Sequence, residues 1–239
     1  MTFIIAEIGV NHGGRLDHAL QLIRAAKEAG ADAAKFQMFE PALLVPGNYE
    51  RQAMLKGLAL TRDELTMCAA ECLHAGIEFM CTPMDVESLH WLTGMPAHLR
   101  PKRIKIGSGQ AMNRTFAAAV AATGLPVIMS TGMNGGDDTE DMLRILTGDV
   151  TLLYCVSQYP TPDTAVSMSA MAALRRYGHP VGFSSHCRSF WPTVAAVYAG
   201  ATVTENHIAP PGTEGPDISS SLLPEEFAAM VREIRGIVA

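Results

Sequence analysis

Short runs of apolar and β-branched residues alternate with helical segments along the whole chain, eight times over and without any repeat of sequence. Strand-then-helix alternation is typical of parallel sheets, because each helix carries the chain back to the start of the next strand. Eight such units in 239 residues predict an α/β fold, a single (β/α)8 barrel domain over residues 1–239. The expected strands are residues 3–8, 33–37, 78–81, 103–106, 126–130, 151–155, 180–184 and 201–206.

Capping residues set the expected helix ends. Asp17 is the predicted N-cap of the first helix, and Asn113 the predicted N-cap of a later one. Pro224 is predicted at the first position of the last helix, which continues over residues 225–238. Residues 38–61 form a long connection with two prolines near its start, and we expect a lid or substrate loop with at most a short helical turn.

Composition excludes several classes of function. The formal net charge is −6 and no basic run is present, which argues against a nucleic-acid partner. No apolar run approaches the roughly 20 residues that span a bilayer, and the N-terminus resembles a strand rather than a signal peptide. Five cysteines, an odd number, suggest reduced thiols and a cytoplasmic location. Cys68 and Cys72 are interpreted as packing residues.

Two histidines follow consecutive predicted strands. His186 comes after residues 180–184 and His207 after residues 201–206, with a predicted helix at 190–200 between them. A βαβ unit places both strand ends on one rim, so the two imidazoles are expected to meet there. Such a pair could bind a divalent metal and leave positions open for a substrate. The alternative is two unrelated histidines at loop entries.

Two lysines lie within predicted strands, where an unpaired charge is costly. Lys35 and Lys105 either pair with buried carboxylates, Glu7 or Glu205, or bind a small anion, for which phosphate is the best candidate. The Gly-Ser-Gly turn around Ser108 supports the anion, because glycines let backbone N–H groups approach an oxyanion.

Other polar residues also lie at or just beyond strand ends, where barrel enzymes carry their chemistry. Hydroxyl donors that fit a phosphorylated substrate are Thr82, Ser130, Ser157 and Ser184. A second group is placed to meet a hydroxyl-rich substrate: Glu7, Asn11, Gln37, Tyr159 and Asp217. Asp217 follows Gly-Pro, so a plain turn is an equal alternative for it.

Several motifs, in order along the chain from about residue 4 to residue 235, resemble the sialic acid (N-acetylneuraminate) synthase family. They are Ala6-Glu7-Ile8-Gly9-Val10-Asn11-His12-Gly13-Gly14, Lys35-Phe36-Gln37, Lys105-Ile106-Gly107-Ser108-Gly109, Ser130-Thr131-Gly132-Met133-Asn134, Tyr159-Pro160-Thr161-Pro162, Ser184-Ser185-His186, Glu205-Asn206-His207 and Gly215-Pro216-Asp217.

The resemblance implies a transferase of sialic acid biosynthesis. Such a barrel condenses phosphoenolpyruvate with an N-acetylmannosamine-like amino sugar, giving a 2-keto-3-deoxy sugar acid and phosphate. By motif match, His186 and His207 would hold Mn²⁺, with Mg²⁺ or Co²⁺ as alternatives. The implied phosphoenolpyruvate contacts are Lys35, Lys105, Ser108, Ser130, Ser157 and Ser184, and the implied sugar-side residues are Glu7, Gln37, Tyr159 and Asp217.

Two departures from the family pattern bear on the chemistry. Gln110 stands where the family has a glutamate, and an amide cannot act as a general base. If that glutamate handles the water or proton step, this chain has lost it, or Glu7 or another group has replaced it. Typical members carry an antifreeze-like domain after the barrel, and residues 1–239 do not include one. The acceptor aldehyde is therefore open, and either a homodimer or a separate partner chain could complete the site.

Two other functions compete with the synthase. A non-catalytic barrel would bind phosphoenolpyruvate and sugar without turnover. A pyruvate-dependent aldolase would use Lys35 or Lys105 to form a Schiff base.

Overall fold

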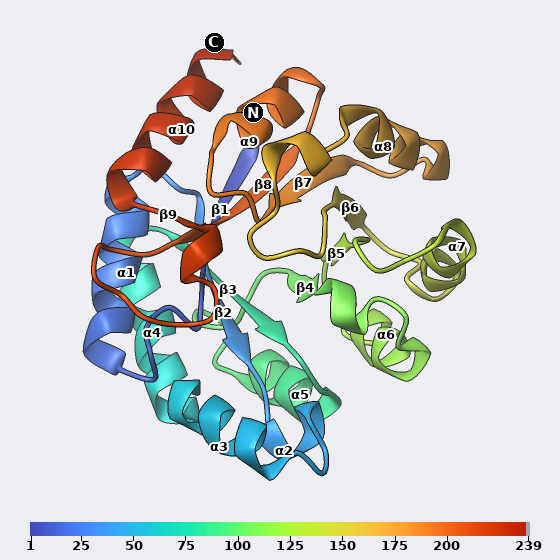
Figure 1. The fold of residues 1–239 in the computed structure, drawn as a ribbon. Coiled ribbons are helices and arrows are strands. Elements are labelled where there is room, and N and C mark those ends of the chain that lie inside the picture. Colours follow the sequence, from blue (N-terminus) through green and yellow to red (C-terminus); the bar gives the residue numbers. More distant parts are fainter. Residues whose placement is uncertain (238–239) are drawn as a thin grey trace.

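The predicted α/β barrel is confirmed. A computed structural model describes residues 1–237, and eight strands run parallel around a common axis (Figure 1). Each predicted strand is present, with ends that differ by at most two residues from the expected ones. The strands are β1 (Phe3–Gly9), β2 (Ala33–Met38), β3 (Glu78–Pro83), β4 (Ile104–Ile106), β5 (Val127–Ser130), β6 (Val150–Tyr154), β7 (Val181–Ser185) and β8 (Val203–Ile208).

Parallel ladders join the strands in the order β3-β2-β1-β8-β7-β6-β5-β4. β3 and β4 lie side by side and close the ring, but within residues 1–237 no ladder joins them. The barrel therefore has one seam. A short strand that the sequence did not predict, β9 (Ser221–Leu222), pairs with β8 and brings Ser221 opposite His207. His207 was expected just beyond the end of this strand, but it lies inside β8.

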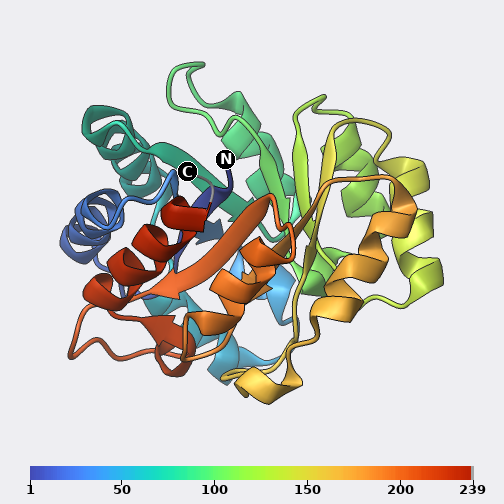
Figure 2. The same cartoon turned by 90° about the horizontal axis from the view of Figure 1, so that it is seen from above.

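Helices form the outer layer of the barrel, as Figures 1 and 2 show from two directions. They are α1 (Leu16–Glu28), α4 (Arg62–Ala75), α5 (Val86–Gly94), α6 (Arg114–Ala121), α7 (Gly136–Ile145), α8 (Met168–Ala173), α9 (Trp191–Tyr198) and α10 (Pro224–Ile237). The predicted cap Asn113 is confirmed, since its side chain accepts a hydrogen bond from the Phe116 N–H, and Pro224 begins α10. The expected continuation of α10 to Val238 lies outside the described residues.

The predicted N-cap Asp17 is wrong. α1 begins at Leu16, two residues earlier than a cap at Asp17 would place it, so Asp17 lies in its first turn. There the carboxylate forms an ion pair with the Arg15 guanidinium instead of capping the helix. An acidic group in the first turn still favours the helix, because the N-terminal end of the helix dipole is positive.

The long connection after β2 is more helical than expected. It forms α2 (Pro41–Leu44) and α3 (Tyr49–Leu58), both on the carboxyl side of β2 in Figure 1. In this fully described segment, neither helix buries a side chain. The end of α3 instead lies backbone to backbone against the loop after β1, since a Cβ at Gly14 would be 2.1 Å from the Gly57 carbonyl oxygen.

The barrel interior has an apolar floor beneath a polar layer. Alternate residues of a strand point to the same face, so residues two apart lie in successive interior layers. The floor is one cluster of buried residues: Ile5, Ala33, Met80, Ile128, Leu153 and Val203. Two positions further along five of these strands stand Glu7, Lys35, Thr82, Ser130 and Glu205, all buried. The tertiary structure thus places a ring of polar side chains at one level.

Two expectations from composition can be compared with the structure. No helix within residues 1–237 has the length and hydropathy needed to cross a membrane. All five cysteines are buried free thiols, and Cys68 and Cys72 pack in the core between α4 and the sheet, as predicted.

Candidate active site

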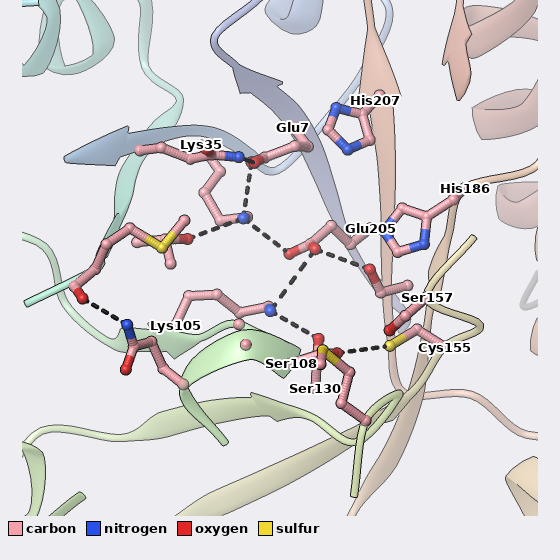
Figure 3. Close-up of a pocket in the computed structure, with 18 of the residues that line it drawn as sticks. Glu7, Lys35, Lys105, Ser108, Ser130, Cys155, Ser157, His186, Glu205 and His207 are labelled. Atoms are coloured by element: carbon pink, nitrogen blue, oxygen red, sulfur yellow. Dashed lines mark hydrogen bonds and ion pairs between the residues drawn. The ribbon is translucent and has the colours of Figure 1, made fainter. Parts of the chain in front are cut away.

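A cavity of about 410 Å³ opens at the carboxyl ends of the strands (Figure 3). Parallel topology brings all these ends to one rim, which is why residues far apart in sequence converge here. Every predicted site residue except Asn11 and Asp217 lines the cavity: Glu7, Lys35, Gln37, Thr82, Lys105, Ser108, Gln110, Ser130, Ser157, Tyr159, Ser184, His186 and His207. Glu205, Cys155, Met84, Met133 and Leu44 line it as well.

The two lysines are paired with buried carboxylates. Lys35 Nζ lies 2.8 Å from Glu7 Oε2 and 3.4 Å from Glu205 Oε2. Lys105 Nζ lies 3.8 Å from Glu205 Oε1. The pairing that the sequence left as an alternative is therefore present. It does not remove the anion hypothesis, because both ammonium groups also face the cavity.

Burial and the neighbouring charges shift the pKa values of the two lysines and the two glutamates in different directions. Burial opposes ionisation of Glu205, yet Lys105 and Lys35 hold its pKa down at about 2. Burial also disfavours the charged form of Lys35, but Glu205 and Glu7 outweigh it and raise the pKa of Lys35. For Glu7, burial dominates over the nearby Lys35 and raises the pKa. Burial lowers the pKa of Lys105 against the opposing effect of Glu205.

Hydroxyl groups on neighbouring strands form hydrogen bonds with three of the four charged groups. Lys35 donates to Thr82 Oγ1 at 3.0 Å, and Lys105 donates to Ser130 Oγ at 2.7 Å. Ser184 donates to Glu205 Oε1 at 2.9 Å, on the strand next to β8. These contacts fix the direction of each lysine and carboxylate around the ring.

Ser108 has a different environment. Its hydroxyl accepts a hydrogen bond from the Gly132 N–H at 3.2 Å, and its oxygen lies 3.2 Å from Cys155 Sγ. Sulfur is a weak hydrogen-bond partner. The Ser108 hydroxyl proton is therefore easily redirected toward a ligand in the cavity.

The two histidines do meet, with ring centroids 5.9 Å apart. His186 Nδ1 lies 2.8 Å from the Val156 carbonyl, which can only accept, so Nδ1 carries the proton. Nε2 then accepts from the Tyr159 hydroxyl at 2.7 Å. Burial lowers the pKa of His186 to about 4, which keeps the ring neutral at pH 7.

This donor arrangement fits a metal. Metal-binding histidines commonly donate the other ring N–H to a backbone carbonyl, as His186 does to Val156. His207 Nδ1 is buried and has no hydrogen-bond partner among the described residues. In residues 1–237 no group of three or more His, Cys, Asp or Glu side chains is placed to hold an ion. An ion at this pair would take its remaining ligands from water or substrate oxygens.

Sequence comparison identifies the family. The sequence model of the NeuB family matches residues 22–239. Over 98% of its length the chain is 35% identical to the N,N'-diacetyllegionaminic acid synthase of Legionella pneumophila, and it covers 71% of that protein. It is 33% identical to the human N-acetylneuraminate-9-phosphate synthase, over 98% of this chain and 69% of that one. The chain belongs to the NeuB family.

A solved structure agrees with this assignment. The N-acetylneuraminic acid (sialic acid) synthetase of Leptospira borgpetersenii superposes with a TM-score of 0.93 at 32% identity. The match covers 100% of this chain and 85% of that chain. The family resemblance and the barrel inferred from the sequence are both confirmed.

Three of the predicted sugar-side residues of this NeuB-family chain, Glu7, Gln37 and Asp217, lie together at one edge of the cavity. Gln37 Nε2 donates to Glu7 Oε1 at 2.8 Å. Asp217 lies at the same edge, since a Cβ built at Gly9 would be 3.2 Å from Gln37 Nε2 and 3.4 Å from Asp217 Oδ2. Asp217 belongs to this group although it does not line the cavity.

Asn11 is not a cavity residue, contrary to expectation. It is fully buried, and its Nδ2 donates to the Ile208 carbonyl and to Ser221 Oγ, both at 2.9 Å. The side chain therefore joins the loop after β1 to β8 and β9. A buried amide that bonds to a backbone carbonyl has a structural role at this position.

Glu205 is the functional residue that the sequence reasoning undervalued. It was considered only as a partner for a lysine, yet it contacts Lys35, Lys105 and Ser184. The signal was available, because Glu205 lies two residues before His207 and so points to the same side of β8.

Proposed function

We propose that this NeuB-family chain condenses phosphoenolpyruvate with an amino-sugar aldehyde, giving a 2-keto-3-deoxy sugar acid and inorganic phosphate. Carbon 3 of the enol forms a bond to the aldehyde carbon, water adds at carbon 2, and phosphate leaves with the bridging oxygen. The acceptor is N-acetylmannosamine-like or a related aldehyde. One observation carries the proposal: a single cavity joins an anion-binding half to a half that can bind an aldehyde and its hydroxyl groups.

The anion half consists of Lys35, Lys105 and the surrounding hydroxyls. Phosphate and carboxylate groups of phosphoenolpyruvate need fixed cations and donors, which these side chains supply in a water-poor site. Ser108 adds a hydroxyl whose proton has only a weak partner, Cys155. Ser157 is exposed at the rim, and Ser130 is already bound to Lys105.

The aldehyde half consists of the histidine pair, Tyr159, Gln37 and Asp217. A divalent ion held by His186 and His207, for which Mn²⁺ is the first candidate and Mg²⁺ or Co²⁺ alternatives, would polarise the aldehyde oxygen. Gln37 and Asp217 would orient the sugar hydroxyls from the opposite edge. Glu7 connects the halves, because it contacts both Lys35 and Gln37.

Glu7 is also the proposed proton carrier. Burial raises its pKa, so this carboxyl can hold a proton closer to neutral pH than a solvated glutamate does. Gln110 cannot do so, since an amide does not titrate. Glu7 is therefore our candidate among the cavity residues for the water and proton steps.

The test is release of inorganic phosphate from phosphoenolpyruvate with Mn²⁺, across a panel of amino sugars and simpler aldehydes. We expect release with one acceptor class, lost with chelator or in His186→Ala, and retained in the control His74→Ala, whose side chain is exposed on α4. Binding of phosphoenolpyruvate without release for any acceptor would instead support a non-catalytic barrel. A lysine adduct trapped by borohydride with pyruvate would support the aldolase.

Assembly and location are part of the same proposal. A homodimer or a separate partner chain would complete the open mouth of the cavity, and light scattering at several protein concentrations would detect self-association. The five buried free thiols support a reducing compartment such as the cytoplasm.

A further inference from the structure

A side-chain amide closes the seam of the barrel at the rim. Gln110 Nε2 donates at 2.7 Å to the carbonyl of Met84, the residue that follows β3. Asn113 Nδ2 donates to Gln110 Oε1 at 3.3 Å, which fixes the orientation of the amide. At the opposite end of the seam, Arg103 forms an ion pair with Glu78. These side chains take the place of the ladder that joins every other pair of neighbouring strands.

Gln110 ends the short turn that presents Ser108 to the cavity. On the β5 side this turn is held twice, because Gly132 donates to Ser108 Oγ and Asn134 Nδ2 donates to the Ala111 carbonyl. On the β3 side, Gln110 makes the one side-chain hydrogen bond from the turn among the described residues. The position of the turn across the seam therefore depends on this amide.

A carboxylate would not serve in this position. The Met84 carbonyl only accepts, so its partner must be a donor. In a glutamate with the same side-chain direction, a carboxylate oxygen would replace Nε2. That oxygen would lie 2.7 Å from the Met84 carbonyl oxygen, the present length of the hydrogen bond. The carbonyl would lose its partner and the carboxylate would be repelled.

We propose that Gln110 is a positioning residue. It fixes the Ser108 turn against the loop after β3, so that the Ser108 hydroxyl and the backbone N–H groups of the turn are held in place for a phosphate group. Residue 110 then transfers no proton, and the amide is required rather than tolerated. The proposal rests on the proposed function only in taking phosphate as the ligand of this turn.

The test uses two variants of nearly the same shape. Gln110→Glu removes the donor and adds a charge, whereas Gln110→Met adds no charge but removes both the donor and the oxygen that accepts from Asn113. Gln158→Glu, at an exposed position between Ser157 and Tyr159, adds the same charge near the rim without touching the seam. Binding of inorganic phosphate is measured by calorimetry, and hydrogen–deuterium exchange is followed in peptides covering residues 104–113 and 150–154.

Both Gln110 variants are expected to weaken phosphate binding about tenfold, because each loses the part-buried hydrogen bond to the Met84 carbonyl. Exchange is expected to accelerate in residues 104–113 and to stay unchanged in residues 150–154. Gln158→Glu should match the parent in both measurements. Conversely, a lower unfolding temperature with unchanged phosphate affinity would leave Gln110 a structural residue and overturn the proposal.

The rate of phosphate release tests the role of Gln110 separately. Faster phosphate release by Gln110→Glu than by the parent, with any acceptor, would mean that the site requires an acid there and would overturn the proposal. If the parent releases no phosphate at all, the synthase function fails. The affinity and exchange measurements still decide the role of Gln110 in that case.

Discussion

The carboxylate of Glu205 and the ammonium of Lys35 lie 3.4 Å apart at the centre of the barrel, and both side chains are almost fully buried. Lys105 approaches the other oxygen of the same carboxylate at 3.8 Å. One negative group therefore holds two positive groups that come from different strands. Lys35 also lies 2.8 Å from Glu7 Oε2, so its ammonium group is held between two carboxyl groups.

We predict that Glu205→Gln destabilises the fold strongly. Two buried lysines would lose a charged partner, a change that typically costs about 3–5 kcal/mol. The free energy of unfolding in urea measures this loss. The matched control is Glu87→Gln, which breaks the exposed pair with Arg62 and should cost no more than about 1 kcal/mol. Equal stability of the two variants would show that the lysines do not depend on Glu205.

Stability is predicted to fall between pH 6.5 and pH 4 because of His12. Burial lowers the pKa of His12 to about 4 from the ordinary value of 6.5, so below pH 6.5 the unfolded chain binds a proton that the folded chain refuses. The stabilisation is complete above pH 6.5 and is lost as the pH falls toward 4, by at most about 3 kcal/mol.

His12→Gln isolates this contribution. The variant should show a shallower fall of the unfolding free energy over the same pH range, whatever its stability at pH 7. His186 also has a pKa of about 4 and remains in both proteins, so part of the slope persists. Identical slopes for parent and variant would exclude His12 as the source.

Two neighbouring glycines test how α3 is attached. Gly13 has φ +61° with nothing near its Cβ position, whereas Gly14 has φ +72° and faces the Gly57 carbonyl oxygen at 2.1 Å. Alanine at either position adopts the left-handed region at a cost of about 1–2 kcal/mol. Only Gly14→Ala also collides with the end of α3.

Because α3 buries no side chain, we expect Gly14→Ala to detach it rather than unfold the barrel. Hydrogen exchange of residues 49–58 should accelerate in Gly14→Ala and remain unchanged in Gly13→Ala. The unfolding free energies of the two variants should be similar. Protection of residues 49–58 in both variants would show that other contacts hold α3.

Metal binding supplies the fourth prediction. Calorimetry with Mn²⁺ alone should detect binding in the parent and in His74→Ala, and none in His186→Ala or His207→Ala. Tyr159→Phe should bind Mn²⁺ up to about tenfold more tightly, because the tyrosine hydroxyl that now occupies His186 Nε2 no longer competes. Mn²⁺ affinities that are the same in the parent and the two histidine variants would exclude the pair as the site.

The fold was accessible from the sequence because its signals are local. Strand runs, the Asn113 cap and the proline that begins α10 depend on residues close in the chain. Asp17 does not cap α1, and its carboxylate forms an ion pair with Arg15 instead. The capping propensity of aspartate does not reveal such a competing contact. β9 is too short to show an alternating hydrophobic pattern in the sequence. It is recognised as a strand only through its pairing with β8.

By itself, the sequence determined that eight parallel strands would bring the lysines, serines and histidines to one rim, because strand polarity fixes which end each loop leaves. It did not determine which groups touch. Only the tertiary structure decided that Glu205 is shared by Lys35 and Lys105, that Asn11 ties backbone instead of lining the cavity, and that Gln110 spans the seam. These contacts join strands and loops remote in sequence, and their partners follow from strand register and barrel closure, which no local pattern encodes.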